Sequence, residues 1–237
     1  MSRERVSPPE RAACQWYLSR CNPRWQLGEF ICAGGSAVVY ELLGEKTPHV
    51  VKIIDSRFMA GRSGNRAADK ELRRKCMQYV ETEIVVMEQL KDCRHTMPLR
   101  AHYTLNSPNG EEAGAYVSVT LLVMPKLTPL LRYITDTKAL TQQDILQLGR
   151  DIGCALGACV KNGILHRDVK PENIFVYQEN GKLRFVLGDF GVSRRVAQPE
   201  GQRITGIGTD YYVAPEIRYG QPLKCLNSDI YSLGVTL

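Results

Sequence analysis

The sequence predicts an α+β protein in two parts: a small antiparallel β-rich lobe with one helix, followed by a mainly helical lobe. The first observation is a series of short β-rich runs separated by turn residues in the first half of the chain. The second is a change to helical spacing of apolar residues after Met124. The third is an ordinary globular composition, 43% hydrophobic and 24% charged in 237 residues. This length suits one large domain or two small lobes.

The first elements precede and form the β-rich lobe. Residues 1–24 are polar and carry three prolines, and Trp16–Leu18 are expected to anchor a short helix there. From Trp25 the pattern changes to short apolar runs, which predict an antiparallel meander. These runs are Phe30–Ile31, Val38–Tyr40 and Val50–Ile54.

The rest of this lobe is predicted as one helix and two further strands. Apolar residues take helical spacing from Ala67 to Lys91, which indicates a long amphipathic helix. Leu99–Leu105 and Tyr116–Met124 are strand-like, and the segment 106–110 between them is rich in turn residues.

The second lobe begins after a connector at residues 125–129. Thr141 and Asp144 stand three residues apart, as in a capping box, and so predict the start of a helix. Asn162–Gly163 is a typical helix stop.

Composition and charge exclude several classes of function. The formal net charge is +6, from 31 basic and 25 acidic residues, and no basic stripe with interleaved aromatics is present, so nucleic-acid binding is not expected. No apolar run is long enough to cross a bilayer and the N-terminus has no secretory h-region, so we expect no membrane segment and a cytoplasmic location. The eight cysteines include no CxxC pair, which favours reduced thiols over a zinc site.

Three motifs in the second half of the chain carry the strongest functional signal. They are His166–Asn173 (HRDVKPEN), Asp189–Gly191 (DFG) and Ala214–Glu216 (APE). In this order and spacing they resemble the signature of the Hanks-type Ser/Thr protein kinases, and the resemblance extends from Trp25 to the last residue. It implies a bilobal protein-kinase-like fold that uses ATP and Mg²⁺ and acts on Ser or Thr hydroxyls of a protein substrate.

Transfer of a phosphoryl group requires positioning and charge neutralisation more than covalent chemistry. The resemblance assigns Asp168 to the attacking hydroxyl and Lys170 to the transferred phosphate. It assigns Asn173 and Asp189 to the metal, because Mg²⁺ prefers oxygen ligands. An aspartate or asparagine alone in a turn is commonly a cap or turn residue, and the joint pattern is what favours catalysis.

The nucleotide-binding part matches the family less closely. The segment 32–39 aligns with the glycine-rich loop but keeps only one of three motif glycines, Gly34. Lys52 matches the strand lysine that binds phosphates. Its partner is expected to be a helix carboxylate, for which Glu83 is favoured over Glu81. The residues expected to contact ATP are Ile31, Cys32, Ala33, Gly34, Gly35, Ser36, Ala37, Val39, Val51 (taken as the residue at the family's usual alanine), Lys52, Met124 as gatekeeper, Pro125, Leu127 and Phe175.

The segment from Asp189 to Glu216 corresponds to the activation segment, which is often ordered by a phosphate. Arg167 before the catalytic aspartate is typical of kinases regulated in this way. Self-phosphorylation is predicted at Thr205, with Ser193 as the alternative acceptor.

The last nine residues resemble the start of the central helix of the kinase second lobe, where Asp229 would brace the catalytic loop. The family pattern continues beyond this point, so the resemblance implies a C-terminally truncated second lobe. A truncated, inactive nucleotide-binding or protein-interaction module is therefore the alternative hypothesis. A small-molecule kinase is a third, against which Lys170 and Ala214–Glu216 argue. The predicted division is 1–24 extension, 25–124 first lobe, 125–129 hinge and 130–237 partial second lobe.

Overall fold

The structure is a computed structural model that describes residues 8–34, 37–55, 66–106, 118–137, 139–195, 211–218 and 227–237. By its internal contacts the chain forms two compact units. The first comprises Met1–Glu81 and Leu99–Lys126, and the second comprises Thr82–Pro98 and Leu127–Leu237. The final change of unit, after Lys126, falls within the predicted connector.

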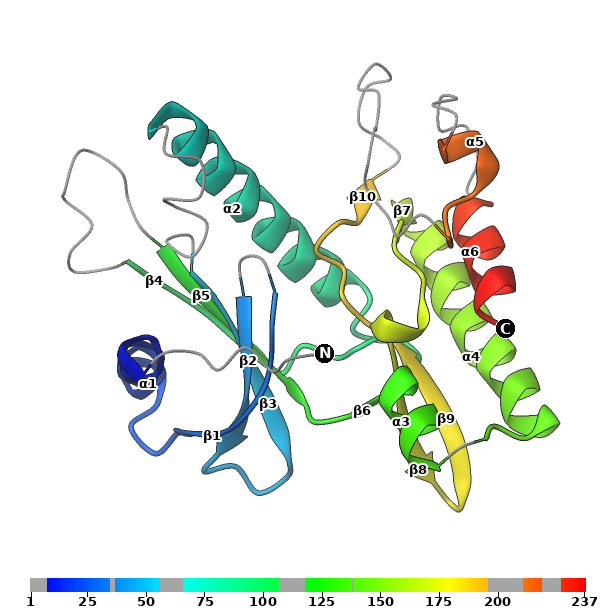
Figure 1. Ribbon diagram of the computed structural model, residues 1–237, viewed down its shortest axis with the longest axis horizontal. Coiled ribbons are helices and arrows are strands. Elements are labelled where there is room, and N and C mark those ends of the chain that lie inside the picture. The colour runs from blue at the N-terminus through cyan, green and yellow to red at the C-terminus, as the bar shows by residue number, and fades with distance from the viewer. Residues whose placement is uncertain are drawn as a thin grey trace. The chain divides into compact units, whose positions relative to one another are not determined.

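The first unit is built on a five-stranded antiparallel sheet (Figure 1). Its strand order is β1-β2-β3-β5-β4, so the first three strands form the predicted meander. The strands are β1 (Gln26–Ala33), β2 (Ala37–Leu43), β3 (His49–Asp55), β4 (Ala101–Asn106) and β5 (Ser118–Pro125).

One face of this sheet holds the hydrophobic core of the first unit. Because successive side chains of a strand alternate between faces, Tyr40, Val51 and Val123 point to the same side and are buried together. The helix α1 (Pro8–Cys21) adds Tyr17 and Leu18 to this core. The prediction that Trp16 also anchors this helix is wrong, since Trp16 is 45% exposed.

The helix α2 (Arg66–Gln89) matches the predicted long helix. Its last turns, from Thr82 onward, and the loop that follows belong to the second unit by internal contacts. Apolar side chains of this helix, among them Val80, Val86 and Met87, are buried.

The second unit is mainly helical, with short strands around one hairpin. The capping box of α4 is confirmed, because the Thr141 hydroxyl accepts from the Asp144 backbone and the Asp144 carboxylate accepts from the Thr141 backbone. The helix ends at Lys161 with Asn162 as its C-cap, and Gly163 follows with φ 65°, a left-handed conformation suited to glycine. The elements are β6 (Thr128–Pro129), α3 (Leu130–Thr137), α4 (Gln142–Lys161), β7 (Ile164–Leu165), the 3-10 turn η2 (Pro171–Asn173), β8 (Ile174–Glu179), β9 (Lys182–Leu187), β10 (Arg194–Arg195), α5 (Pro215–Arg218) and α6 (Ser228–Thr236).

Within the described ranges, no helix combines the length and the apolar character that crossing a membrane requires.

Candidate active site

The catalytic-loop residues predicted from the sequence lie together between β7 and β8. The Asn173 amide nitrogen donates to the Asp168 backbone oxygen and to its carboxylate oxygen Oδ2, each over 2.8 Å. The Lys170 ammonium lies 2.7 Å from the same Oδ2 atom. Since the Asn173 nitrogen is engaged in this way, its amide oxygen is the atom that can serve a cation. The loop therefore presents a carboxylate, an amide oxygen and a positive charge within one short segment.

The backbone of this loop is held by a buried carboxylate from α6. Asp229 accepts the backbone N–H of His166 over 2.7 Å and that of Arg167 over 2.8 Å. Arg167 has φ 73°, a left-handed conformation that is strained for a non-glycine residue. The two hydrogen bonds hold the chain at this strained position, which confirms the bracing expected of Asp229.

A second segment, at the end of β9, is fixed against the same loop. The Gly188 N–H donates to the Asn173 backbone oxygen over 2.8 Å, and the Gly188 oxygen lies 3.0 Å from Nε2 of His166. The His166 ring also meets the Phe190 ring edge to face, with centroids 5.0 Å apart, and both side chains are fully buried. Asp189 lies between these anchors with φ 61°, so its backbone position is set on both sides.

The glycine before Asp189 allows the close packing of Phe175, the predicted floor of the nucleotide. A Cβ atom at Gly188 would lie 2.9 Å from the Phe175 ring. Only glycine fits without movement of that ring.

Glu83, on the part of α2 that belongs to the second unit, lies beside this second segment. A Cβ atom built at Gly191 would be 3.5 Å from Asp189 Oδ1 and 3.6 Å from Glu83 Oε2. Glu83 is buried, whereas Glu81 is exposed, so burial favours Glu83 as the carboxylate of functional interest. Lys52 belongs to the first unit, and its pairing with Glu83 stays a prediction.

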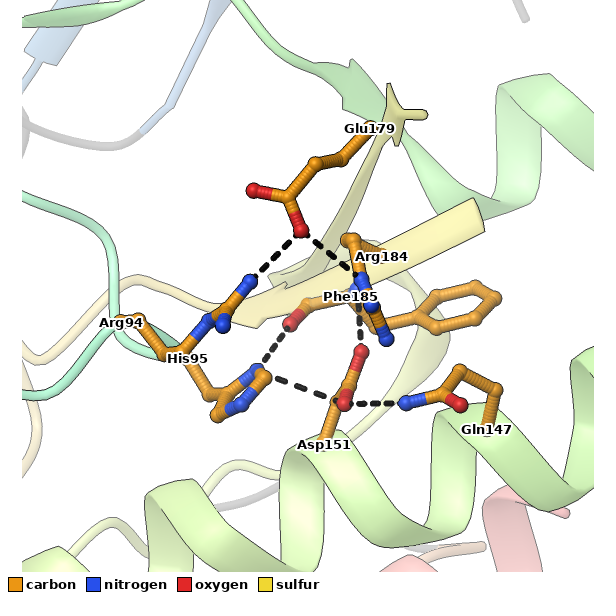
Figure 2. Close-up of polar contacts among 7 residues, drawn as sticks. All are labelled: Arg94, His95, Gln147, Asp151, Glu179, Arg184 and Phe185. Atoms are coloured by element: carbon orange, nitrogen blue, oxygen red, sulfur yellow. Dashed lines mark hydrogen bonds and ion pairs between the residues drawn. The ribbon is translucent and has the colours of Figure 1, made fainter. Parts of the chain in front are cut away.

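A buried polar cluster supports the strand that leads to Asp189 (Figure 2). Asp151 of α4 accepts the Phe185 backbone N–H over 3.0 Å and a Gln147 side-chain N–H over 2.6 Å. A third neighbour of Asp151 is His95, whose Nδ1 is 3.5 Å from the Asp151 carboxylate. The His95 backbone oxygen in turn accepts the Leu187 N–H over 2.9 Å. The cluster thus joins α4, β9 and the loop after α2.

Charged side chains continue this cluster at the surface. Glu179 lies 2.7 Å from Arg94 and 3.1 Å from Arg184. The hydrogen bond from Arg184, followed by the charge of Arg94, lowers the pKa of the Glu179 carboxyl below its ordinary value. Such exposed ion pairs contribute little to stability, so the buried Asp151 is the stronger anchor.

The sequence reasoning did not find this cluster. One signal was available, because Asp151 is an acidic residue at a core position of the helical pattern, between Leu148 and Ile152. A buried acid must be hydrogen-bonded, which would have indicated backbone or histidine partners.

In the first unit, Lys52 lies on β3 opposite Val39 of β2 and Leu122 of β5. Val50 lies two residues before Lys52 and therefore shares its face of the sheet. Val51 is fully buried in the core on the other face, so the prediction that Val51 contacts the nucleotide is wrong. Because side chains alternate along the strand, Val50, which pairs with Met124, is the residue that shares the sheet face of Lys52.

The other predicted nucleotide residues are placed as follows. Cys32 pairs with Val39 on β1 and β2, and the Gly34 N–H donates to the Ala37 oxygen over 2.8 Å, which closes the hairpin. Ile31 and Ala33 are on β1, and Pro125 ends β5. Leu127 is the first residue of the segment Leu127–Leu237 of the second unit, and Gly35 and Ser36 are outside the described residues.

The donor set can be tested against a divalent ion. In the described part of the chain, no three His, Cys, Asp or Glu side chains converge into a metal-binding group. One carboxylate and one amide oxygen suit Mg²⁺, which is commonly held by few protein ligands together with substrate phosphates and water. Asn173 and Asp189 fit that pattern. The Gly188 N–H donates to the Asn173 backbone oxygen, which brings Asp189, the next residue, close to Asn173.

A β-rich unit followed by a helical unit, with this loop and the segment after β9, is typical of one class of phosphoryl-transfer proteins. Comparison with known proteins identifies the family. The chain matches the protein kinase domain over residues 25–237 and belongs to the protein kinase family.

Curated relatives are of the same kind. The chain is 29% identical over 217 residues, 90% of its length, to a probable serine/threonine-protein kinase KCC4 of Saccharomyces cerevisiae. It is 29% identical over 197 residues, 82% of its length, to calcium/calmodulin-dependent protein kinase type 1 of Caenorhabditis elegans. A shorter match, 36% over 108 residues and 46% of the chain, is to a membrane-associated tyrosine- and threonine-specific cdc2-inhibitory kinase of the same worm. The matches cover 19%, 53% and 15% of these relatives.

Proposed function

We propose that this chain is an ATP-dependent protein kinase that transfers the γ-phosphoryl group of ATP to serine or threonine hydroxyls. The observation that carries the proposal is the network in which Asn173 and Lys170 both contact the Asp168 carboxylate, with Asp229 bracing the loop beneath. This arrangement fixes a proton acceptor and a positive charge in one place before any substrate arrives. Such preorganisation is the main source of catalysis in phosphoryl transfer.

Each residue then has a definite role. Asp168 accepts the proton of the attacking hydroxyl, which its carboxylate can do while Asn173 holds one oxygen in position. Lys170 supplies positive charge where negative charge develops on the transferred group. Asn173 and Asp189 would hold Mg²⁺, which when bound neutralises phosphate charge.

The specificity for serine and threonine over tyrosine rests on Lys170, two residues after Asp168, and on the serine/threonine relatives. One relative bears a name that also includes tyrosine. Phosphoamino-acid analysis of an acceptor protein incubated with Mg-ATP tests this directly. We expect phosphoserine and phosphothreonine; phosphotyrosine alone would contradict the assignment.

The metal role is tested by Asp189→Asn, with Asp136→Asn on the exposed α3 as the matched control. We expect Asp189→Asn to lower the rate of transfer at least about 100-fold, because the variant lacks a carboxylate that would hold the charge-neutralising Mg²⁺. Nucleotide binding without any transfer by the wild-type chain would support the inactive-module hypothesis and contradict ours.

We also propose self-phosphorylation at Thr205, which lies outside the described residues. Ser193, the alternative acceptor, is buried here and its backbone N–H donates to the Phe190 oxygen. Mass spectrometry after incubation with Mg-ATP should find phosphate on Thr205. Phosphate found only outside residues 192–209 would contradict this.

A further inference from the structure

The helix α1 precedes the kinase match, which begins at residue 25, yet it is an integral part of the first unit. Its side chains Cys14, Tyr17 and Leu18 are each less than 5% exposed and complete the core on one face of the sheet. That face is opposite the one that carries Lys52, since Val51 points into the core. The helix therefore covers the back of the strands that present the predicted nucleotide residues.

The strand β1 is the edge of the sheet, and a side chain of α1 completes its hydrogen bonding. The Gln15 amide nitrogen donates to the Trp25 oxygen over 3.1 Å, and the Leu27 N–H donates to the Gln15 amide oxygen over 2.8 Å. In an extended strand these two backbone groups, two residues apart, point to the same side. The single amide group of Gln15 thus takes the place that a neighbouring strand would occupy and covers an edge that is otherwise open.

Arg11, one helical turn before Gln15, continues this contact along the strand. Its Nη2 donates to the Leu27 and Gly28 oxygens, each over 2.9 Å. Its guanidinium also lies over the ring of Tyr40 on β2, 5.1 Å from the centroid. One arginine therefore joins β1 and β2.

The contact falls where β1 is irregular. The pairing of β1 with β2 shifts register between Leu27 and Phe30, and again between Phe30 and Cys32. Each such shift leaves a residue of β1 without a regular ladder partner, so hydrogen bonds from outside the sheet add to the few that hold this strand.

We propose that Arg11 and Gln15 of α1 act as positioning residues that fix β1, including its residues 31–33, in the arrangement that binds the nucleotide. The inference rests on the proposed function, since it concerns the same ATP-binding residues. Loss of the contact lowers the fraction of molecules with β1 in the binding-competent position. The apparent dissociation constant for ATP rises by the same factor.

The test compares Arg11→Ala, Gln15→Leu and the conservative Arg11→Lys with wild type. Arg20→Ala is the matched control, because Arg20 lies on the same helix, lies over the Trp16 ring and is exposed. Three quantities are measured: hydrogen exchange of the peptide 26–33 without nucleotide, the KM for Mg-ATP, and kcat. Melting curves verify that each variant is folded.

We expect faster exchange in 26–33 and a KM raised at least about threefold for Arg11→Ala and Gln15→Leu, with kcat nearly unchanged. Arg11→Lys should recover part of the loss, and Arg20→Ala should match wild type. Wild-type exchange rates and a wild-type KM in folded Arg11→Ala and Gln15→Leu would overturn the inference. A kcat that changes by the same factor as KM would also overturn it. A wild-type chain that does not bind Mg-ATP would overturn the proposed function instead, while the exchange measurement still decides whether α1 fixes β1.

Discussion

Removal of the Asp229 carboxylate should loosen the catalytic loop, because two backbone N–H groups of that loop donate to it. In Asp229→Ala, two backbone N–H groups, of His166 and Arg167, lose the acceptor that lies 2.7 and 2.8 Å away. Each buried donor left without an acceptor costs about 1–3 kcal/mol, so the loss of two should lower the free energy of unfolding by about 2–6 kcal/mol. The left-handed Arg167 would also lose the bonds that hold it.

Asp229→Asn separates the number of acceptors from the size of the side chain. The amide keeps one oxygen acceptor but turns an N–H₂ group toward the other donor, so we expect an intermediate loss of stability. Urea unfolding gives the free energies, and hydrogen exchange of the peptide around His166 reports the loop directly. The control is Asp136→Ala, an exposed acid on α3 paired with Arg132 at 3.4 Å, which should leave both unchanged. Wild-type stability and exchange in Asp229→Ala would refute the reasoning.

Three further predictions follow from the second unit. Asp151→Ala should lower the free energy of unfolding by about 1–3 kcal/mol, because the buried backbone N–H that it accepts loses its partner; urea unfolding equal to wild type would contradict this. Gly188→Ala should cost about 1–3 kcal/mol by overpacking against Phe175, and Phe175→Leu in the same chain should recover most of it; simple additivity of the two changes in urea unfolding would exclude this contact. Burial, with a smaller effect of a nearby carboxylate, raises the pKa of the Cys159 thiol from 9.0 to about 12. The unfolded thiol ionises first as pH rises, so this group's contribution to stability is complete below pH 9 and is lost between about 9 and 12. At pH 8 a maleimide should therefore label the exposed Cys154 and spare Cys159 in the native protein, and mass spectrometry showing equal labelling would be inconsistent with that burial.

Much of the fold was predictable from local pattern. The meander, the long helix and the capping box of α4 follow from apolar spacing and turn chemistry, which act over a few residues. The Asp168–Asn173 contact was predictable from the spacing of one motif, because a short turn (Pro171–Asn173) brings the two residues together.

What the sequence did not predict depends on faces and on distant pairing. Val51 was assigned to the nucleotide by its place beside Lys52, but neighbouring strand residues point to opposite faces, and it is Val50 that shares the face of Lys52. The Gln15 contact with β1 joins a side chain to backbone groups 10 and 12 residues away, and no local pattern signals such a bond. Trp16, Tyr17 and Leu18 were together expected to anchor the first helix; Tyr17 and Leu18 are in the core, whereas Trp16 is exposed.

The central claim is that this chain transfers phosphate and that Asp168 carries the transfer. The most direct measurement is incorporation of labelled γ-phosphate from Mg-ATP into an acceptor protein by wild type, Asp168→Asn and Asp136→Asn. The account predicts transfer by wild type and Asp136→Asn, and a rate at least about 100-fold lower for Asp168→Asn with ATP binding retained. Equal rates in wild type and Asp168→Asn would contradict it.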